Sequence, residues 1–180
     1  WHACAQSWCP PGATWTYGTD AFGLFGYQQY SYVGDTVIGG LNGQRITGQG
    51  AMSYFGQSQV DYWTDTLGFV TALDGDVIVI WYADQQDWDT LFWLGASPGD
   101  GWLRRNGPYG SCDPRDSIVV IDTSTVIVDG LALRQWEAEQ RWTGGTTGTL
   151  LFTERIGWDW SFEPLPACLI IDGPSGMRCY

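Results

Sequence analysis

The chain has 180 residues, and its 20 Asp and Glu against 8 Arg and no Lys give a net charge of −12. This length suits one domain with a core of its own. The acidic balance excludes nucleic acid and anionic membranes as partners, because both are bound through clustered cations. With 12 Trp, 9 Tyr and 7 Phe, the chain has more rings than such a core needs, so we expect some of them on the surface in contact with a partner.

Runs of β-branched and aromatic residues alternate with Gly, Asp and Pro clusters along the whole chain. This pattern is typical of a single antiparallel β-sandwich or barrel domain with little or no helix. In chain order we expect strands at 13–19, 27–33, 36–38, 44–48, 52–54, 59–64, 68–73, 77–81, 89–94, 117–122, 125–128, 131–142, 149–155, 168–171 and 177–180. No apolar run approaches the length of a membrane span, so membrane insertion is not expected.

Two of these runs, 77–81 and 118–121, are apolar throughout and predict central strands buried on both faces. The Gly- and Pro-rich stretch 95–115 is expected to be the longest connection and a contact loop. Residues 1–10, WHACAQSWCP, are too few to form a core and are interpreted as an N-terminal arm before a domain over 11–180. Such an arm either packs on its own domain or adds to a sheet edge of the next subunit, which would build filaments.

Two stretches, 36–45 and 125–134, share a β-branched run, a turn with Gly, a Leu and then an Arg. The turn residues 39–40 and 129–130 supply the positive φ of a tight hairpin, so we expect two hairpins of one kind. The stretch Asp-Gly-Asp at 74–76 is likewise interpreted as a turn. A calcium site would need about six to eight oxygen ligands, which the surrounding sequence does not offer.

Five cysteines are spread along the chain without a CxxC pair or zinc-ligand spacing: Cys4, Cys9, Cys112, Cys168 and Cys179. We therefore expect disulfides and an oxidising compartment. Cys168 and Cys179 lie on the last two expected strands and form the natural pair, whereas Cys4 and Cys9 could close a small loop or reach Cys112. The odd count leaves one thiol over. Because the sequence also begins with Trp rather than Met, we interpret it as a mature exported chain, extracellular or at the cell surface.

Acid and base chemistry at neutral pH most often uses histidine, yet the only one is His2, in the arm. Carboxylates could flank a glycosidic bond in two places: Glu154 with Glu163, and Asp84, Asp87 and Asp89 beside Trp88. Glycoside hydrolysis needs two carboxyl groups at a fixed separation, and Asp at strand ends ordinarily serves turns. We predict no catalytic residue, no cofactor and no metal site.

Five segments follow one another: ATWTYG, YSYVGDTVIGGLNGQRI, WDTLFWLGASPGD, DTSTVIVDGLALRQW and TERIGWDWSFEPLPACLIIDGPSGMRCY. Their order resembles the β-rich amino-terminal region of secreted Bacteroidota proteins that carry a type IX secretion sorting domain. The resemblance covers nearly the whole chain after Pro11, although the usual Gly-Ile-Gly element reads Arg155-Ile156-Gly157 here. No sorting domain follows Tyr180, which would fit its removal after secretion. The resemblance implies export and surface display, and it brings no catalytic residues with it.

An Asp-(Ser/Thr)-aliphatic triplet occurs four times, and its hydroxyl residues are Thr36, Thr66, Thr90 and Ser117. The triplet is similar to the acceptor pattern for general O-glycosylation of exported Bacteroidota proteins. Turn-closing Asp followed by a β-branched residue would also generate it. Covalent glycans and a purely structural origin therefore both remain open.

These patterns predict a non-enzymatic, exported structural or adhesive protein that assembles with copies of itself, as a fibre or filament, through aromatic contacts. The rings expected at the interface are Trp1, Trp8, Trp88 and Trp160. The main alternative is a carbohydrate-binding module of a surface glycan system, because tryptophan-rich segments can stack on sugar rings. A glycoside hydrolase is the third alternative.

Overall fold

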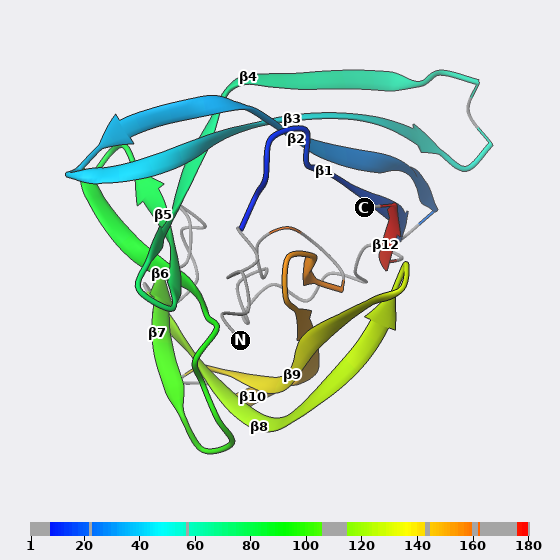
Figure 1. Ribbon diagram of the computed structural model, residues 1–180. Helices are drawn as coiled ribbons and strands as arrows, with labels where there is room; N and C mark the ends of the chain where they lie inside the picture. The colour runs from blue at the N-terminus through cyan, green and yellow to red at the C-terminus, as the bar shows by residue number, and fades with distance from the viewer. Residues whose placement is uncertain are drawn as a thin grey trace.

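In the computed structural model the chain is all-β, which confirms the expected class (Figure 1). The structure describes residues 8–21, 23–56, 58–105, 115–142, 145–159, 162 and 176–179. Two antiparallel sheets curl around a shared interior, each forming about half of a barrel. The two sheets meet where β6 contacts β7.

The first sheet has seven strands in the order β12-β1-β2-β3-β4-β5-β6. Their bounds are β1 Thr14–Ala21, β2 Leu24–Ile38, β3 Leu41–Tyr54, β4 Asp61–Asp74, β5 Val77–Tyr82, β6 Asp87–Trp93 and β12 Gly176–Cys179. The second sheet has five strands in the order β11-β10-β9-β8-β7. Its strands are β7 Gly101–Arg105, β8 Arg115–Val128, β9 Leu131–Trp142, β10 Gly145–Thr153 and β11 Gly157–Trp158.

Several strands are longer than the sequence indicates, because bulges interrupt the local pattern without ending the pairing. The expected strands at 27–33 and 36–38 are one strand, β2, with a register shift between Tyr32 and Gly34. The expected strands at 59–64 and 68–73 are likewise one strand, β4. Opposite it, the pairing with β3 shifts between Ile46 and Gly48, so three residues of β4 face one of β3.

Two of the expectations on the strands are wrong. The stretch 95–115 is not a single connection, since it contains β7, which pairs with β8 from Gly101 to Arg105. In β8, Ile118 and Val120 are buried but Ile121 is exposed, so this run is not buried on both faces. The other apolar run matches the expectation, because consecutive residues of β5, 78–80, are all buried.

The turns follow the expected chemistry. Gly39 and Gly40, between β2 and β3, have φ of +52° and +82°, and Asp129 and Gly130, between β8 and β9, have φ of +50° and +79°. Both loops are therefore two-residue hairpins with positive φ at each central position. Gly75 in the turn from β4 to β5 has φ of +63°, which confirms that 74–76 is a hairpin turn.

The interior is filled mainly by aromatic rings. The buried rings are Trp8, Trp15, Tyr17, Phe92, Trp136, Phe152, Trp158 and Phe162. They contact one another directly; Phe92 and Phe152 stack with centroids 4.1 Å apart, and Trp15 meets Phe162 edge-on at 5.1 Å. The interior thus absorbs a large part of the rings that the composition assigned to the surface.

From residue 8 onward, the N-terminal arm packs against the domain. Trp8 is 4% exposed, lies within the core cluster and donates its indole N–H to Thr71 Oγ1 at 3.0 Å. The expectation that Trp8 is an interface ring is therefore wrong. Of the two alternatives for the arm, its described part packs on its own domain; residues 1–7, including Trp1, lie outside the described residues.

Candidate functional site

The outer face of the first sheet carries a row of amides and hydroxyls that crosses four strands. Its members are Thr16 on β1, Gln29 on β2, Gln49 on β3 and Thr64 on β4, each the register partner of the next. We call them the polar row. Gln49 donates its amide N–H to Gln29 Oε1 at 2.7 Å, and Gln29 donates to Thr16 Oγ1 at 3.3 Å. The amides are thus held by one another in a line perpendicular to the strands.

Beside the polar row runs a second row on the same face, two residues further along each strand. It consists of Gly18, Tyr27, Ala51 and Tyr62, again in cross-strand register. We call it the tyrosine row. Gly18 and Ala51 are buried and small, whereas Tyr27 and Tyr62 are exposed. The two exposed tyrosines therefore flank Ala51 on this face.

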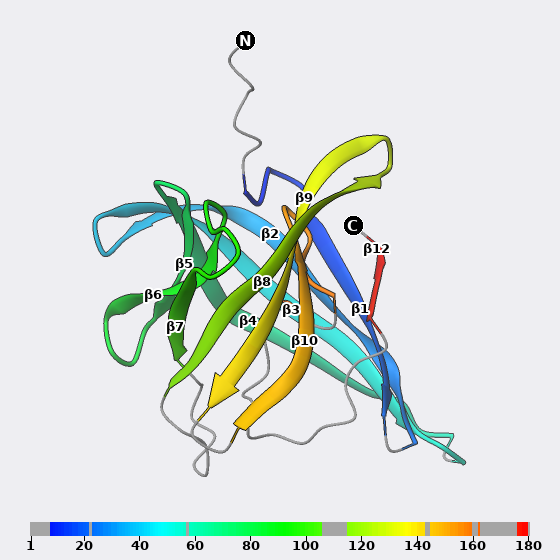
Figure 2. The same ribbon diagram turned by 90° about the horizontal axis from the view of Figure 1, so that it is seen from below.

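Exposed apolar side chains gather at this end of β2, β3 and β4, and we call the group the aromatic end. Its members are Phe25, Tyr27, Tyr54, Phe55, Val60 and Tyr62. Phe55 is 82% exposed and Tyr62 is 77% exposed. Phe25 and Phe55 contact each other with centroids 6.3 Å apart, and Phe55 donates its backbone N–H to the carbonyl of Gly23 at 2.6 Å. Figure 2 shows the cyan and teal ends of β3 and β4 projecting beyond the rest of the barrel at the lower right.

The tryptophans contribute little to the surface. Among the nine whose side chains the structure describes, none is classed as exposed. Trp88, expected at an interface, is half-buried and meets Trp81 edge-on at 5.3 Å beneath the turn at Gly39. Trp160, also expected at an interface, lies outside the described residues. Among the described residues, the exposed rings are those of Tyr and Phe, which the sequence did not single out.

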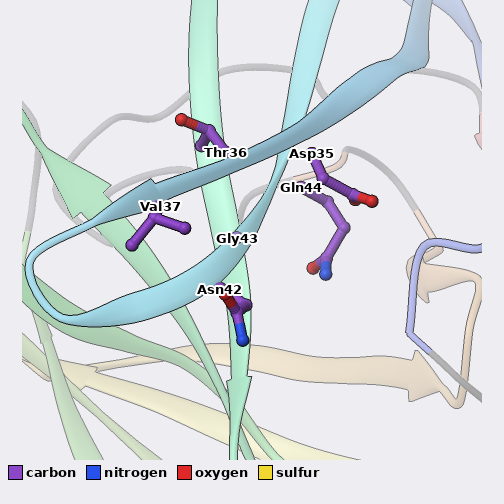
Figure 3. Close-up of a pocket in the computed structure, with 6 residues that line it drawn as sticks. All are labelled: Asp35, Thr36, Val37, Asn42, Gly43 and Gln44. Carbon is purple, nitrogen blue, oxygen red and sulfur yellow. The ribbon is translucent and has the colours of Figure 1, made fainter.

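A shallow pocket of about 340 Å³ lies at the opposite end of β2 and β3, where the two strands form their hairpin (Figure 3). It is lined by Asp35, Thr36, Val37, Asn42, Gly43 and Gln44. Asn42 and Gln44 extend to one side of the ribbon, and Thr36 extends to the other. Asp35 accepts a hydrogen bond from the Tyr32 hydroxyl at 3.0 Å, so this carboxylate is held within its own strand.

The carboxylates considered for glycoside hydrolysis serve structural contacts. Asp87 forms an ion pair with Arg105 at 2.8 Å, and Asp89 accepts the backbone N–H of Arg105 at 2.6 Å. These bonds tie β6 to β7 at the junction of the two sheets. Glu154, in the turn after β10, accepts the backbone N–H of Arg134 at 3.3 Å. Its expected partner Glu163 lies outside the described residues.

The four triplets have different surroundings. Asp65 accepts the backbone N–H groups of Leu67 and Gly68 at 3.1 and 3.0 Å, so this triplet is an Asx turn that forms the bulge of β4. Its Thr66 is exposed. Thr36, Thr90 and Ser117 are each half-buried within strands. Of the four hydroxyls proposed as acceptors, Thr66 is the most accessible.

Cys9 is a free thiol and is buried, so of the five disulfide candidates this one is unpaired. Burial, together with the nearby Asp35 carboxylate, raises the pKa of the Cys9 thiol to about 12. The backbone of Cys179 lies in β12, where it pairs with Thr16 of β1. Cys4, Cys112 and Cys168 lie outside the described residues.

Two other features are absent from the described residues. Within them, no three His, Cys, Asp or Glu side chains come together in a group that could hold a metal ion. The same part of the chain contains no helix long and apolar enough to cross a membrane.

No family model matches this chain, and no curated protein or solved structure matches it.

Proposed function

We propose that the chain is a non-catalytic, exported adhesive domain that works by surface contact, and that the aromatic end is its contact surface. The observation that carries this proposal is the clustering of six exposed apolar side chains at one projecting end, in a molecule whose nine described tryptophans are all buried or half-buried. Exposed apolar clusters of this kind ordinarily mark sites of association. The acidic, lysine-free composition and the resemblance to exported chains support a location outside the cell.

Two variants with matched exposure test this proposal. Phe55→Ser with Tyr62→Ser removes the two most exposed rings of the aromatic end, which are 82% and 77% exposed. Val37→Ser with Ile127→Ser removes two side chains of similar exposure, 72% and 69%, from the other hairpin ends. Neither pair belongs to the core, so both proteins should fold as the wild type does.

Adhesion of the full chain is then measured on two kinds of surface, one coated with the chain itself and one with a panel of polysaccharides. Wild type and the Val37/Ile127 control should be retained on at least one of these surfaces. The Phe55/Tyr62 variant should be retained at least about tenfold more weakly, and a tenfold ratio is equivalent to about 1.4 kcal/mol. Equal retention of all three proteins, or no retention on any surface, would contradict the proposal.

A further inference from the structure

The outer face of the first sheet combines exposed rings with an aligned set of amides and hydroxyls. The polar row and the tyrosine row lie next to each other across β1 to β4, so a ligand lying along one also touches the other. Tyr27 and Tyr62 are separated by one strand, or about 9.5 Å from the spacing of neighbouring strands. An extended ligand crossing the strands therefore meets two rings in succession.

The chemistry of these two rows indicates a neutral ligand rich in hydroxyl groups. Apart from the tyrosine phenols, neither row contains an ionisable side chain; among the described residues, the neighbouring row on this face includes one carboxylate, Asp20, at the register position of Phe25. A glutamine amide has two donor hydrogens and two acceptor lone pairs. The bonds from Gln49 to Gln29 and from Gln29 to Thr16 therefore still leave both amides with capacity for a ligand.

Charge distinguishes between the occupants that could use such a face. A net charge of −12 on each molecule disfavours a second copy and disfavours polyanions, because like charges repel as they approach. A neutral polymer meets no such barrier. Exposed rings beside fixed amides also match the two surfaces of a sugar, whose C–H groups pack on a ring face while its hydroxyls exchange hydrogen bonds.

We infer that the two rows form a binding site for a neutral polysaccharide chain that lies across β2, β3 and β4, with Tyr27 and Tyr62 stacking on sugar rings and Gln29 and Gln49 bonding to hydroxyls. This inference rests on the proposed contact function and names its ligand class. It places the sugar contacts on tyrosines rather than on the tryptophan-rich segments that the sequence suggested.

Affinity electrophoresis of the full chain tests the inference. The gels contain a neutral glucan, a neutral mannan or a neutral xylan, and polygalacturonate serves as the anionic comparison. At least one neutral polysaccharide should retard the wild type, and Tyr62→Ala and Gln49→Leu should each weaken that binding about fivefold or more. Tyr62→Phe, which keeps the ring, should bind within about twofold of wild type.

Tyr54→Ala is the matched control. Tyr54 belongs to the aromatic end and is 54% exposed, but it pairs with Leu24 and so points to the opposite side of the sheet from Tyr27. Binding that survives in Tyr54→Ala and fails in Tyr62→Ala supports the two rows rather than general stickiness. Thermal unfolding of each variant verifies that the fold is intact.

Three outcomes overturn the inference: no retardation by any neutral polysaccharide, equal retardation of wild type and both loss variants, or stronger retardation by polygalacturonate. Sedimentation velocity of the same proteins distinguishes this failure from failure of the proposed function. Self-association lost in the Tyr62→Ala variant, without polysaccharide binding, would overturn the glycan site and leave the contact function standing. A chain that neither self-associates nor binds any polysaccharide would overturn both.

Discussion

Trp8 donates its indole N–H to the hydroxyl of Thr71, 63 positions further along the chain, with both groups buried. The bond connects the N-terminal segment to β4, and the ring itself packs against Trp15 and Phe92. The start of the described chain is therefore part of the core rather than a free arm. Any assembly through an arm would have to use residues before Trp8.

Trp8→Phe should destabilise the fold by about 1–3 kcal/mol. The substitution keeps an aromatic ring in the core and removes the N–H, so the buried hydroxyl of Thr71 loses its donor and pays a desolvation cost. The measurement is the free energy of unfolding by urea.

Trp93→Phe provides a control for this measurement. Trp93 also donates its indole N–H to a side chain, Asp76 Oδ2 at 3.1 Å, but that bond is exposed. Water can replace the lost donor there, so the cost should stay below about 1 kcal/mol. Equal losses in the two variants would contradict the importance assigned to burial of the Trp8–Thr71 bond.

The Cys9 thiol should make stability fall at alkaline pH. Its pKa is raised from about 9 to about 12 in the folded protein by burial and by Asp35. The folded state therefore keeps the thiol proton between pH 9 and pH 12, where the unfolded state releases it. This contribution to stability is complete below pH 9 and is lost as pH rises to 12.

The measurement is the free energy of unfolding of wild type and Cys9→Ala from pH 8 to 11. The free energy of unfolding should fall more steeply with pH in wild type than in Cys9→Ala. The difference in slope should correspond to up to one proton per molecule. The tyrosines titrate in both proteins, and their common effect cancels in the difference. Parallel curves would show that the Cys9 pKa is not raised.

The tight hairpins could be predicted from the sequence because their signals are local. Gly39-Gly40 and Asp129-Gly130 identify the turns without reference to the rest of the chain, since positive φ at both central positions suits few other residues. The strand boundaries near bulges could not be predicted. Asp65 and Gly68 carry the local signals of a turn, and only the pairing with β3 on both sides shows that the strand continues.

The candidate site depends on the register of four strands, which no short segment of sequence contains. Gln29 and Gln49 lie 20 positions apart, and their alignment follows from the bulge-free pairing of β2 with β3 between Leu24 and Tyr32. The number of aromatic residues predicts too many rings at the surface, because a curled barrel interior holds more aromatic side chains than the chain length indicates. The sequence carries no signal that separates Tyr27 and Tyr62 from the other tyrosines, and Trp8, which it singles out as a contact ring, is buried in the core.

Gly68→Ala should be far more destabilising than Gly75→Ala, although the two glycines have almost the same φ, +60° and +63°. Both substitutions place an L-residue in the left-handed region, which costs about 1–2 kcal/mol. A Cβ at Gly68 would also overlap the backbone carbonyl oxygen of Ile46, whereas a Cβ at Gly75 has no neighbour within 4 Å. The carbonyl cannot yield without disturbing the pairing of β3 with β4.

The thermal midpoints of the two variants measure this difference. Gly75→Ala should lower the midpoint by a few degrees, and Gly68→Ala should lower it by clearly more or prevent folding. Equal midpoints would contradict the close approach of the Ile46 carbonyl on β3 to Gly68 in the bulge of β4.

Arg134 should contribute more to stability than Arg141, which lies on the same strand. Arg134 donates to the carbonyls of Leu94 and Ala96 at 3.0 and 2.7 Å, and its guanidinium lies 4.8 Å from the ring centroid of Trp136. These contacts join β9 to the segment that follows β6, so they fix the second sheet against the first. A lysine has no planar fork and cannot reach both carbonyls in this way.

Arg134→Lys should therefore cost about 1.5–3 kcal/mol of unfolding free energy, the range for hydrogen bonds of charged groups. Arg141 pairs with Glu139 at 2.6 Å on an exposed part of β9, and Arg141→Lys should change stability by less than about 0.5 kcal/mol. Adding 1 M NaCl should leave the cost of Arg134→Lys largely unchanged, because its partners are backbone carbonyls rather than exposed charges. Equal costs at the two positions would show that the Arg134 contacts do not hold the two sheets together.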